Sequence, residues 1–89
     1  MKHLNIHVSG KVQGVFFRAS AKEQADQLDV KGFTRNEPNG DVYIEAEGDE
    51  SKLKLFLEWC SHGPRHAHVE NITKEESALR NFEKFEVRR

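Results

Sequence analysis

The sequence lacks the features that mark several specialised classes of protein. Its single cysteine, Cys60, excludes an intrachain disulfide and a Cys-x-x-Cys metal site. No apolar run approaches the roughly 20 residues of a membrane-spanning helix, and the polar, alternating start MKHLNIHV differs from a signal peptide. These absences predict a soluble, cytoplasmic protein that does not associate with a membrane.

The chain also lacks an excess of charge of either sign. Fourteen Lys and Arg residues stand against fifteen Asp and Glu residues, which leaves a formal net charge of -1. No global basic field therefore favours nucleic acid, and any anion site must be local. A chain of 89 residues buries only about 60–65% of the surface that its unfolded form exposes. Residues 1–89 are therefore predicted to form a single domain, which we expect to be a monomer.

Hydrophobic periodicity in the first half predicts a strand, a helix and a hairpin. Apolar and polar residues alternate over 4–9, which is typical of a strand with one buried face. From about Phe17 to Leu28, an apolar stripe recurs at helical spacing among polar residues. Residues 33–36 and 42–46 flank Asn39-Gly40, and this pair predicts a hairpin because both residues tolerate positive φ.

The second half predicts a further helix and two short strands. Four apolar residues recur at the helical spacing i, i+3, i+4 and i+7, and they are Leu53, Phe56, Leu57 and Cys60. Asp49 or Ser51 is placed to cap this helix, and Gly63-Pro64 is placed to end it. Residues 67–73 and the alternation over 85–87 predict the two strands.

The resulting element order is βαββαβ with a short extra strand at the end. This order is typical of the α+β class, in the ferredoxin-like split βαβ arrangement. We expect two helices on one face of an antiparallel sheet of four to five strands, with the first and third strands as central neighbours. The other face would stay open. This topology serves enzymes, RNA-binding modules, metal carriers and regulatory domains alike, so it does not decide function.

The segment SGKVQGVFFR joins the first strand to the first helix. Backbone N–H groups at the start of a helix form a natural seat for an anion, and Gly10 and Gly14 allow a ligand to approach the main chain closely. The alternative is an ordinary turn, because two glycines at this spacing are a weak signal. Three apolar residues would anchor the loop from beneath: Val12, Val15 and Phe16.

Arg18 strengthens the anion-site interpretation. A cation in the first turn opposes the helix dipole by about 0.3–1 kcal/mol unless an anion is bound there. A guanidinium also matches two phosphate oxygens at once. The alternative is a solvated surface arginine. The loop lacks the Gly-Lys-Ser/Thr ending of a P-loop, so it brings no magnesium ligand.

Asn36 ends the second predicted strand, which the sheet places beside the third and near the first. The sheet can therefore carry its amide toward the loop. An amide is no general base near neutral pH, but it can accept a hydrogen bond from water and orient that water. Asn36 could equally cap a turn.

The remaining polar groups do not form a recognisable catalytic set. His3 and His7 share one face of the first strand, and His66 and His68 share a face of a later one. Without a cysteine or an evident carboxylate partner, we expect them to be solvated and to bind no metal. Two carboxylates on the third strand are also expected to be exposed, and they are Glu45 and Glu47.

A phosphate site without a metal, acid or nucleophile requires a substrate whose leaving group departs without protonation. Acyl phosphates meet this requirement, because their leaving group is a carboxylate of low basicity. Orientation and stabilisation of charge then suffice for hydrolysis.

Two blocks of the sequence resemble those of the acylphosphatase family. SGKVQGVFFR is similar to the family pattern Gly-x-Val-Gln-Gly-Val-x-Phe-Arg, and GFTRNEPNGDVYIEAEG is similar to its second pattern. The blocks have the family's order and spacing, and the resemblance covers the whole chain. It implies a ferredoxin-like sandwich and a metal-independent, cofactor-free hydrolysis of a small-molecule acyl phosphate to a carboxylate and inorganic phosphate. Nucleic acid and membrane partners are not implied.

The resemblance also implies roles for individual residues. Arg18 would bind the phosphoryl group and Asn36 would orient the attacking water, while the substrate phosphate accepts the proton of that water. No covalent enzyme intermediate is implied. The backbone N–H groups that would bind the phosphate belong to Gly14, Val15, Phe16, Phe17 and Arg18.

The chain departs from the family pattern only at its periphery. Asp29 replaces a usual glycine after the first helix and is expected to reduce stability there, because the left-handed conformation disfavours a side chain. The ending Arg88-Arg89 replaces a common aromatic residue, which puts local packing in question. Other departures are Phe33 for tryptophan, Asn39 for aspartate and Arg65 for a second proline.

Three rival classes share the predicted topology. An RNA-binding module would need paired aromatic residues on the open sheet face, and Tyr43 alone does not supply them. A metal carrier would need a Cys-x-x-Cys in the first loop, where residues 12–15 read VQGV. A regulatory domain that binds an anion without turnover would present a similar loop, so this alternative stays open.

Overall fold

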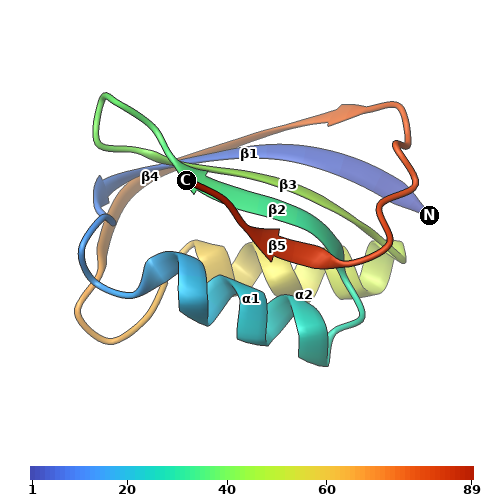
Figure 1. The fold of residues 1–89 in the computed structure, drawn as a ribbon, viewed down its shortest axis with the longest axis horizontal. Coiled ribbons are helices and arrows are strands. Elements are labelled where there is room, and N and C mark those ends of the chain that lie inside the picture. Colours follow the sequence, from blue (N-terminus) through green and yellow to red (C-terminus); the bar gives the residue numbers. More distant parts are fainter.

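A computed structural model describes residues 1–89. The chain forms, in order, β1 (Lys2–Lys11), α1 (Phe17–Gln27), β2 (Lys31–Asn36), β3 (Val42–Gly48), α2 (Glu50–Cys60), β4 (His68–Ser77) and β5 (Phe85–Val87), as Figure 1 shows. The predicted element order is confirmed, and β4 extends four residues beyond its predicted end. None of the helices has the length and apolar character needed to cross a membrane.

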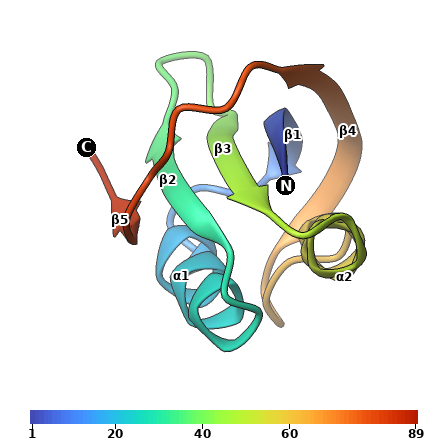
Figure 2. The ribbon, with the colours of Figure 1, turned by 90° about the vertical axis from the view of Figure 1, so that its right-hand side faces the viewer.

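The five strands form one sheet in the order β4-β1-β3-β2-β5, so β1 and β3 are the central neighbours as predicted. The β1–β4, β1–β3 and β2–β3 pairs are antiparallel, whereas β5 lies parallel to β2 at the outer edge. The sheet is therefore mixed. Both helices cover the same face, as the end-on view in Figure 2 shows.

The core lies between this face and the helices. Strand alternation directs Ile6 and Val8 of β1, and Val42 and Ile44 of β3, toward the helices, and none of these four side chains is exposed. Each such side chain contributes about 1.5–3 kcal/mol on burial. The helices contribute Phe17, Ala21, Ala25, Leu53, Phe56 and Cys60.

The helix ends agree only partly with the predicted caps. Asp49 precedes α2 but makes no capping hydrogen bond with its side chain, and Ser51 lies inside the helix. The break at Gly63 is confirmed, because its backbone is left-handed and its N–H donates to the carbonyl of Trp59 at 2.8 Å. Asp29 adopts a left-handed φ of 57°, the conformation that glycine tolerates best at the end of a helix.

Part of the sheet face opposite the helices is covered, whereas His7 on the same face is exposed. Residues 78–84 join β4 to β5 and are called the strap here; they cross this face in Figure 2. The Phe82 ring lies 5.8 Å from the His3 ring and 5.9 Å from the Phe33 ring, measured between centroids. The prediction of an open face is therefore wrong where the strap crosses it, because strand periodicity does not reveal a strap of irregular backbone.

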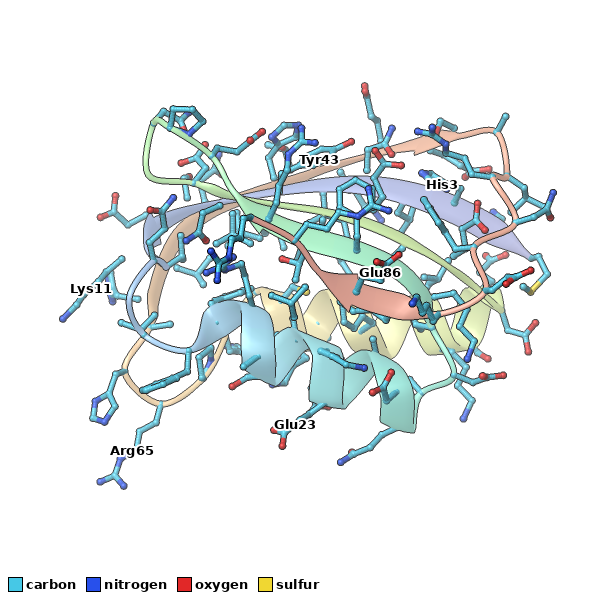
Figure 3. The ribbon with its side chains drawn as sticks, viewed as in Figure 1. His3, Lys11, Glu23, Tyr43, Arg65 and Glu86 are labelled. Atoms are coloured by element: carbon cyan, nitrogen blue, oxygen red, sulfur yellow. The ribbon has the colours of Figure 1, made fainter.

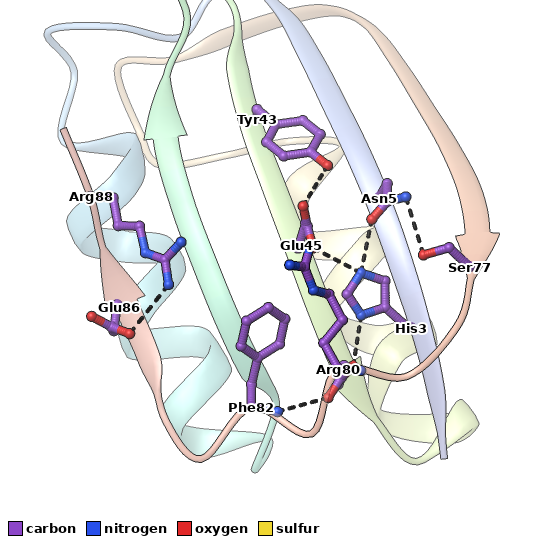
Figure 4. Close-up of polar contacts among 10 residues, drawn as sticks. His3, Asn5, Tyr43, Glu45, Ser77, Arg80, Phe82, Glu86 and Arg88 are labelled. Carbon is purple, nitrogen blue, oxygen red and sulfur yellow. Dashed lines mark hydrogen bonds and ion pairs between the residues drawn. The ribbon is translucent and has the colours of Figure 1, made fainter.

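His3, Glu45 and Glu47 lie beneath the strap and are only 0%, 7% and 2% exposed, so the prediction that they are solvated is wrong. His3 Nδ1 lies 2.7 Å from Glu47 Oε2. His3 Nε2 lies 3.0 Å from Glu45 Oε1, and Figure 4 shows these two side chains facing each other. The strap amides of Arg80 and Phe82 donate to Glu47. Burial is tolerated because each charged group has partners.

This buried cluster shifts two pKa values. Burial, followed by the hydrogen bond with Glu45, raises the pKa of Tyr43 to about 12. Burial alone would also raise the pKa of Glu47, but the amides of Arg80 and Phe82 and the His3 ring outweigh it and lower that pKa below its usual 4.5. Glu47 is therefore ionised at neutral pH. Figure 3 shows His3 and Tyr43 on the sheet face away from the helices.

Candidate active site

The loop between β1 and α1 is anchored by three buried side chains. Val12 and Val15 are 1% and 7% exposed, as predicted, but Phe16 is 79% exposed, so its predicted anchoring role is wrong. Phe17 takes that place, with its ring 5.4 Å from the Trp59 ring. Phe16 enters the helix with a left-handed backbone of φ 64° and ψ 24°, which costs a non-glycine residue about 1–2 kcal/mol.

The backbone N–H groups of residues 14–18 make no hydrogen bond to another backbone group in this loop or in the first turn of α1. The first internal bond of the helix is donated by Ser20 to the carbonyl of Phe16 at 3.0 Å. Unpaired N–H groups at a helix start attract an anion, because the helix dipole is positive there. The predicted phosphate-binding backbone is therefore free to donate.

Arg18 lies in this first turn, half-buried. Its Nη1 donates to the backbone carbonyl of Arg88 at 2.7 Å, while the first turn contains no acidic residue. The guanidinium is thus oriented by a neutral carbonyl and forms no ion pair with a carboxylate. The ring of Phe33 packs under the guanidinium of Arg88, 4.0 Å from the ring centroid, so the unusual C-terminus is packed.

Asn36 is the last residue of β2 and pairs with Val42, which pairs with Val8. This register places Asn36 on the helix side of the sheet, where the loop lies. Asn36 and Arg18 line one cavity of about 290 Å³. The other lining residues are Val12, Gly14, Phe16, Phe17, Ala19 and Val87. The two predicted catalytic residues therefore share a cavity, whereas the buried side chain of Val15 does not reach it.

Gln13 connects the loop to the β2–β3 hairpin, a role that sequence reasoning missed. Its Nε2 donates to the carbonyl of Glu37 at 2.8 Å and to that of Asp41 at 2.9 Å. These bonds fix the loop relative to the strand end that carries Asn36. The available signal was the position of Gln13 inside the first family pattern. The contact of Arg18 with the carbonyl of Arg88 could not be predicted from the sequence, since every residue has a backbone carbonyl.

No group of three or more His, Cys, Asp or Glu side chains is placed to hold a metal ion. His7, His66 and His68 are exposed, as predicted. Cys60 is completely buried, and burial raises the pKa of its thiol so that it stays protonated. The cavity therefore contains a positive charge and hydrogen-bond donors, and no Ser, Thr, Cys, Lys, Asp, Glu or His side chain lines it.

The chain is similar to known proteins of one family along nearly its whole length. The family model described as Acylphosphatase matches residues 4–87. An acylphosphatase of Rubrobacter xylanophilus is 44% identical over 88 residues, which cover 98% of this chain and 80% of the relative.

Two solved structures are also similar over nearly their whole length. The acylphosphatase from Bacillus subtilis has a TM-score of 0.97 at 34% identity, covering 100% of both chains. An acylphosphatase from Coxiella burnetii has a TM-score of 0.94 at 38% identity, covering 98% of this chain and 92% of the other. Fold and family together define a ferredoxin-like hydrolase that acts on acid anhydrides. The chain belongs to the acylphosphatase family.

Proposed function

We propose that the protein hydrolyses the carboxyl-phosphate bond of acyl phosphates to a carboxylate and inorganic phosphate. The observation that carries this proposal is the shared cavity of Arg18 and Asn36, which lies beside a run of unpaired backbone N–H groups. A phosphoryl group and a water molecule can be held there side by side. Their correct relative placement supplies most of the catalysis that such a substrate needs.

The loop holds the phosphoryl group. The N–H groups of Gly14 through Arg18 surround its oxygens at the positive end of the α1 dipole. Arg18 adds its charge: one Nη1 hydrogen is held by the carbonyl of Arg88, and the remaining donors of the planar fork are available to two phosphate oxygens. These donors stabilise the charge that spreads over the oxygens as the bond to the leaving group breaks.

Asn36 orients the attacking water. Its side-chain oxygen accepts a hydrogen bond from that water, and the water oxygen attacks phosphorus opposite the carboxylate. The bond between phosphorus and the acyl oxygen breaks, and the carboxylate leaves with the electron pair. One proton of the water moves to the phosphate itself, so no enzyme base and no covalent intermediate take part.

The remaining features of the proposal follow from the same chemistry. The carboxylate leaving group needs no protonation, so the reaction proceeds without a metal or cofactor. We propose that residues 1–89 form one such domain, which acts on small molecules as a cytoplasmic monomer without a nucleic acid or membrane partner.

Turnover in a chelator tests the proposal. Purified protein in excess EDTA should release phosphate from acetyl phosphate and benzoyl phosphate and should barely hydrolyse simple phosphate monoesters, whose leaving groups require protonation. Arg18→Gln serves as the control for a contaminating phosphatase. If the protein binds phosphate without turnover, it is an anion-binding regulatory domain; if EDTA abolishes activity, the reaction depends on a metal. Either result would overturn the proposal.

A further inference from the structure

The protein exposes five large hydrophobic side chains, and two of them line the cavity of Arg18 and Asn36. These two are Phe16, which is 79% exposed, and Val87, which is 44% exposed. The other three lie elsewhere and are Met1, Leu55 and Leu79. Exposed aromatic surface is unfavourable in water, because a phenyl ring has a large apolar area. Two of the five exposed apolar side chains therefore lie at the cavity that also contains Arg18 and Asn36.

The backbone of Phe16 makes its exposure more informative. Phe16 occupies the N-cap position of α1 with a left-handed φ of 64°, yet its side chain makes no capping hydrogen bond. Asn, Asp or Gly would tolerate this conformation better. The aromatic side chain therefore stabilises neither the helix nor the core, and strained residues of this kind concentrate at ligand sites.

The two apolar side chains approach the cavity from different elements. Phe16 ends the loop before α1, and Val87 belongs to β5, where it pairs with Thr34. The polar donors of the same cavity come from the loop amides, Arg18 and Asn36. The site thus has a polar part for the phosphoryl group and an apolar part at its rim.

We propose that Phe16 and Val87 determine acyl-group specificity by packing against the acyl part of the substrate. The preferred substrates are acyl phosphates with an aromatic or large apolar acyl group, such as benzoyl phosphate, over those with a small one, such as acetyl phosphate. This inference rests on the function proposed above. The preference arises because a phenyl group removes the exposed surfaces of Phe16 and Val87 from water, whereas a methyl group is too small to do so.

The ratio of kcat/KM for benzoyl phosphate to kcat/KM for acetyl phosphate tests this inference. The ratio is the readout because the amide of Phe16 also takes part in phosphate binding, so either rate alone would mix two effects. Phe16→Ala should lower the ratio about 3- to 10-fold, as expected for the loss of one aromatic contact. Val87→Ala should lower it about 3-fold, and Phe16→Leu should give an intermediate ratio because it keeps apolar bulk.

Leu55→Ala is the matched control, since Leu55 is a similarly exposed apolar residue on α2 away from the cavity. It should leave the ratio unchanged. If the ratios of Phe16→Ala and Val87→Ala both stay within about two-fold of the wild-type ratio, a difference too small for a lost contact, the specificity inference is wrong while the proposed function stands. If the wild-type protein hydrolyses neither substrate, the proposed function fails and the inference fails with it.

Discussion

The Nδ1 atom of His3 lies 2.7 Å from Oε2 of Glu47, and both side chains are buried between the sheet and the strap. The other ring nitrogen of His3 lies 2.8 Å from Asn5 Oδ1 and 3.0 Å from Glu45 Oε1. Both ring nitrogens of His3 therefore lie within hydrogen-bond distance of side-chain oxygens. These contacts connect β1, β3 and the strap, since the amides of Arg80 and Phe82 also donate to Glu47.

Glu47→Gln should destabilise the fold by about 2–3 kcal/mol, since the change leaves His3 and two strap amides with a weaker acceptor. Chemical denaturation at pH 7 measures the free energy of unfolding. Glu75→Gln is the matched control, because Glu75 is an exposed carboxylate on β4 and makes no ion pair. Equal stability of the two variants would show that the buried cluster contributes nothing specific.

The same carboxylate predicts the direction of the acid dependence. The folded-state pKa of Glu47 lies below its usual 4.5. The stabilisation is therefore fully present above pH 4.5 and is lost as the pH falls below 4.5 through the folded-state value. Wild-type stability should fall over this range more steeply than that of Glu47→Gln. Parallel pH profiles would contradict this assignment.

Hydrophobic periodicity predicted the strands and helices but not the strap that covers part of the sheet face. Alternation within β1 and β3 correctly separated the two faces of the sheet, and helical spacing located α1 and α2. Hydrophobic periodicity could not show that residues 78–84 fold back over the far face, because the strap has no regular alternation of apolar and polar residues. His3 and Glu47 consequently looked like solvated polar residues, although each is the other's partner across 44 positions of sequence.

Thr34→Val should raise the free energy of unfolding by about 1 kcal/mol. Thr34 is fully buried, and its Oγ1 has no hydrogen-bond partner, so its hydroxyl bears a desolvation cost that the methyl group of valine avoids. The urea midpoint should rise while the m-value stays constant. Thr73→Val, at an exposed position of β4, should change little. A lower midpoint for Thr34→Val would mean that the hydroxyl is hydrogen-bonded in solution.

Gln13→Ala should lower kcat/KM about 10- to 100-fold without unfolding the protein. It removes the two hydrogen bonds that hold the loop against the carbonyls of Glu37 and Asp41, and small displacements of reacting groups have costs of this order. Steady-state kinetics with an acyl phosphate and a thermal melt measure the two effects. Gln27→Ala, on an exposed position of α1, provides the control. Unchanged kinetics in Gln13→Ala would contradict a positioning role for these bonds.

The sequence indicated some residues of the candidate site but not others. Arg18 and Asn36 could be singled out because a cation at a helix start and an amide at a strand end are chemically informative, and the family resemblance supported both. The exposure of Phe16 could not be predicted, since an aromatic residue between two apolar neighbours normally reads as core. Only the left-handed backbone, which periodicity does not encode, separates Phe16 from the buried Phe17.

The division of roles between Arg18 and Asn36 is the central claim, and paired binding and turnover measurements on two variants test it most directly. Asn36→Ala should lower kcat for benzoyl phosphate at least about 100-fold while the Kd for inorganic phosphate stays close to that of the wild type. Arg18→Gln should weaken phosphate binding and turnover together, because it removes a charged donor to the phosphoryl group. An equal loss of phosphate affinity in both variants would contradict the account.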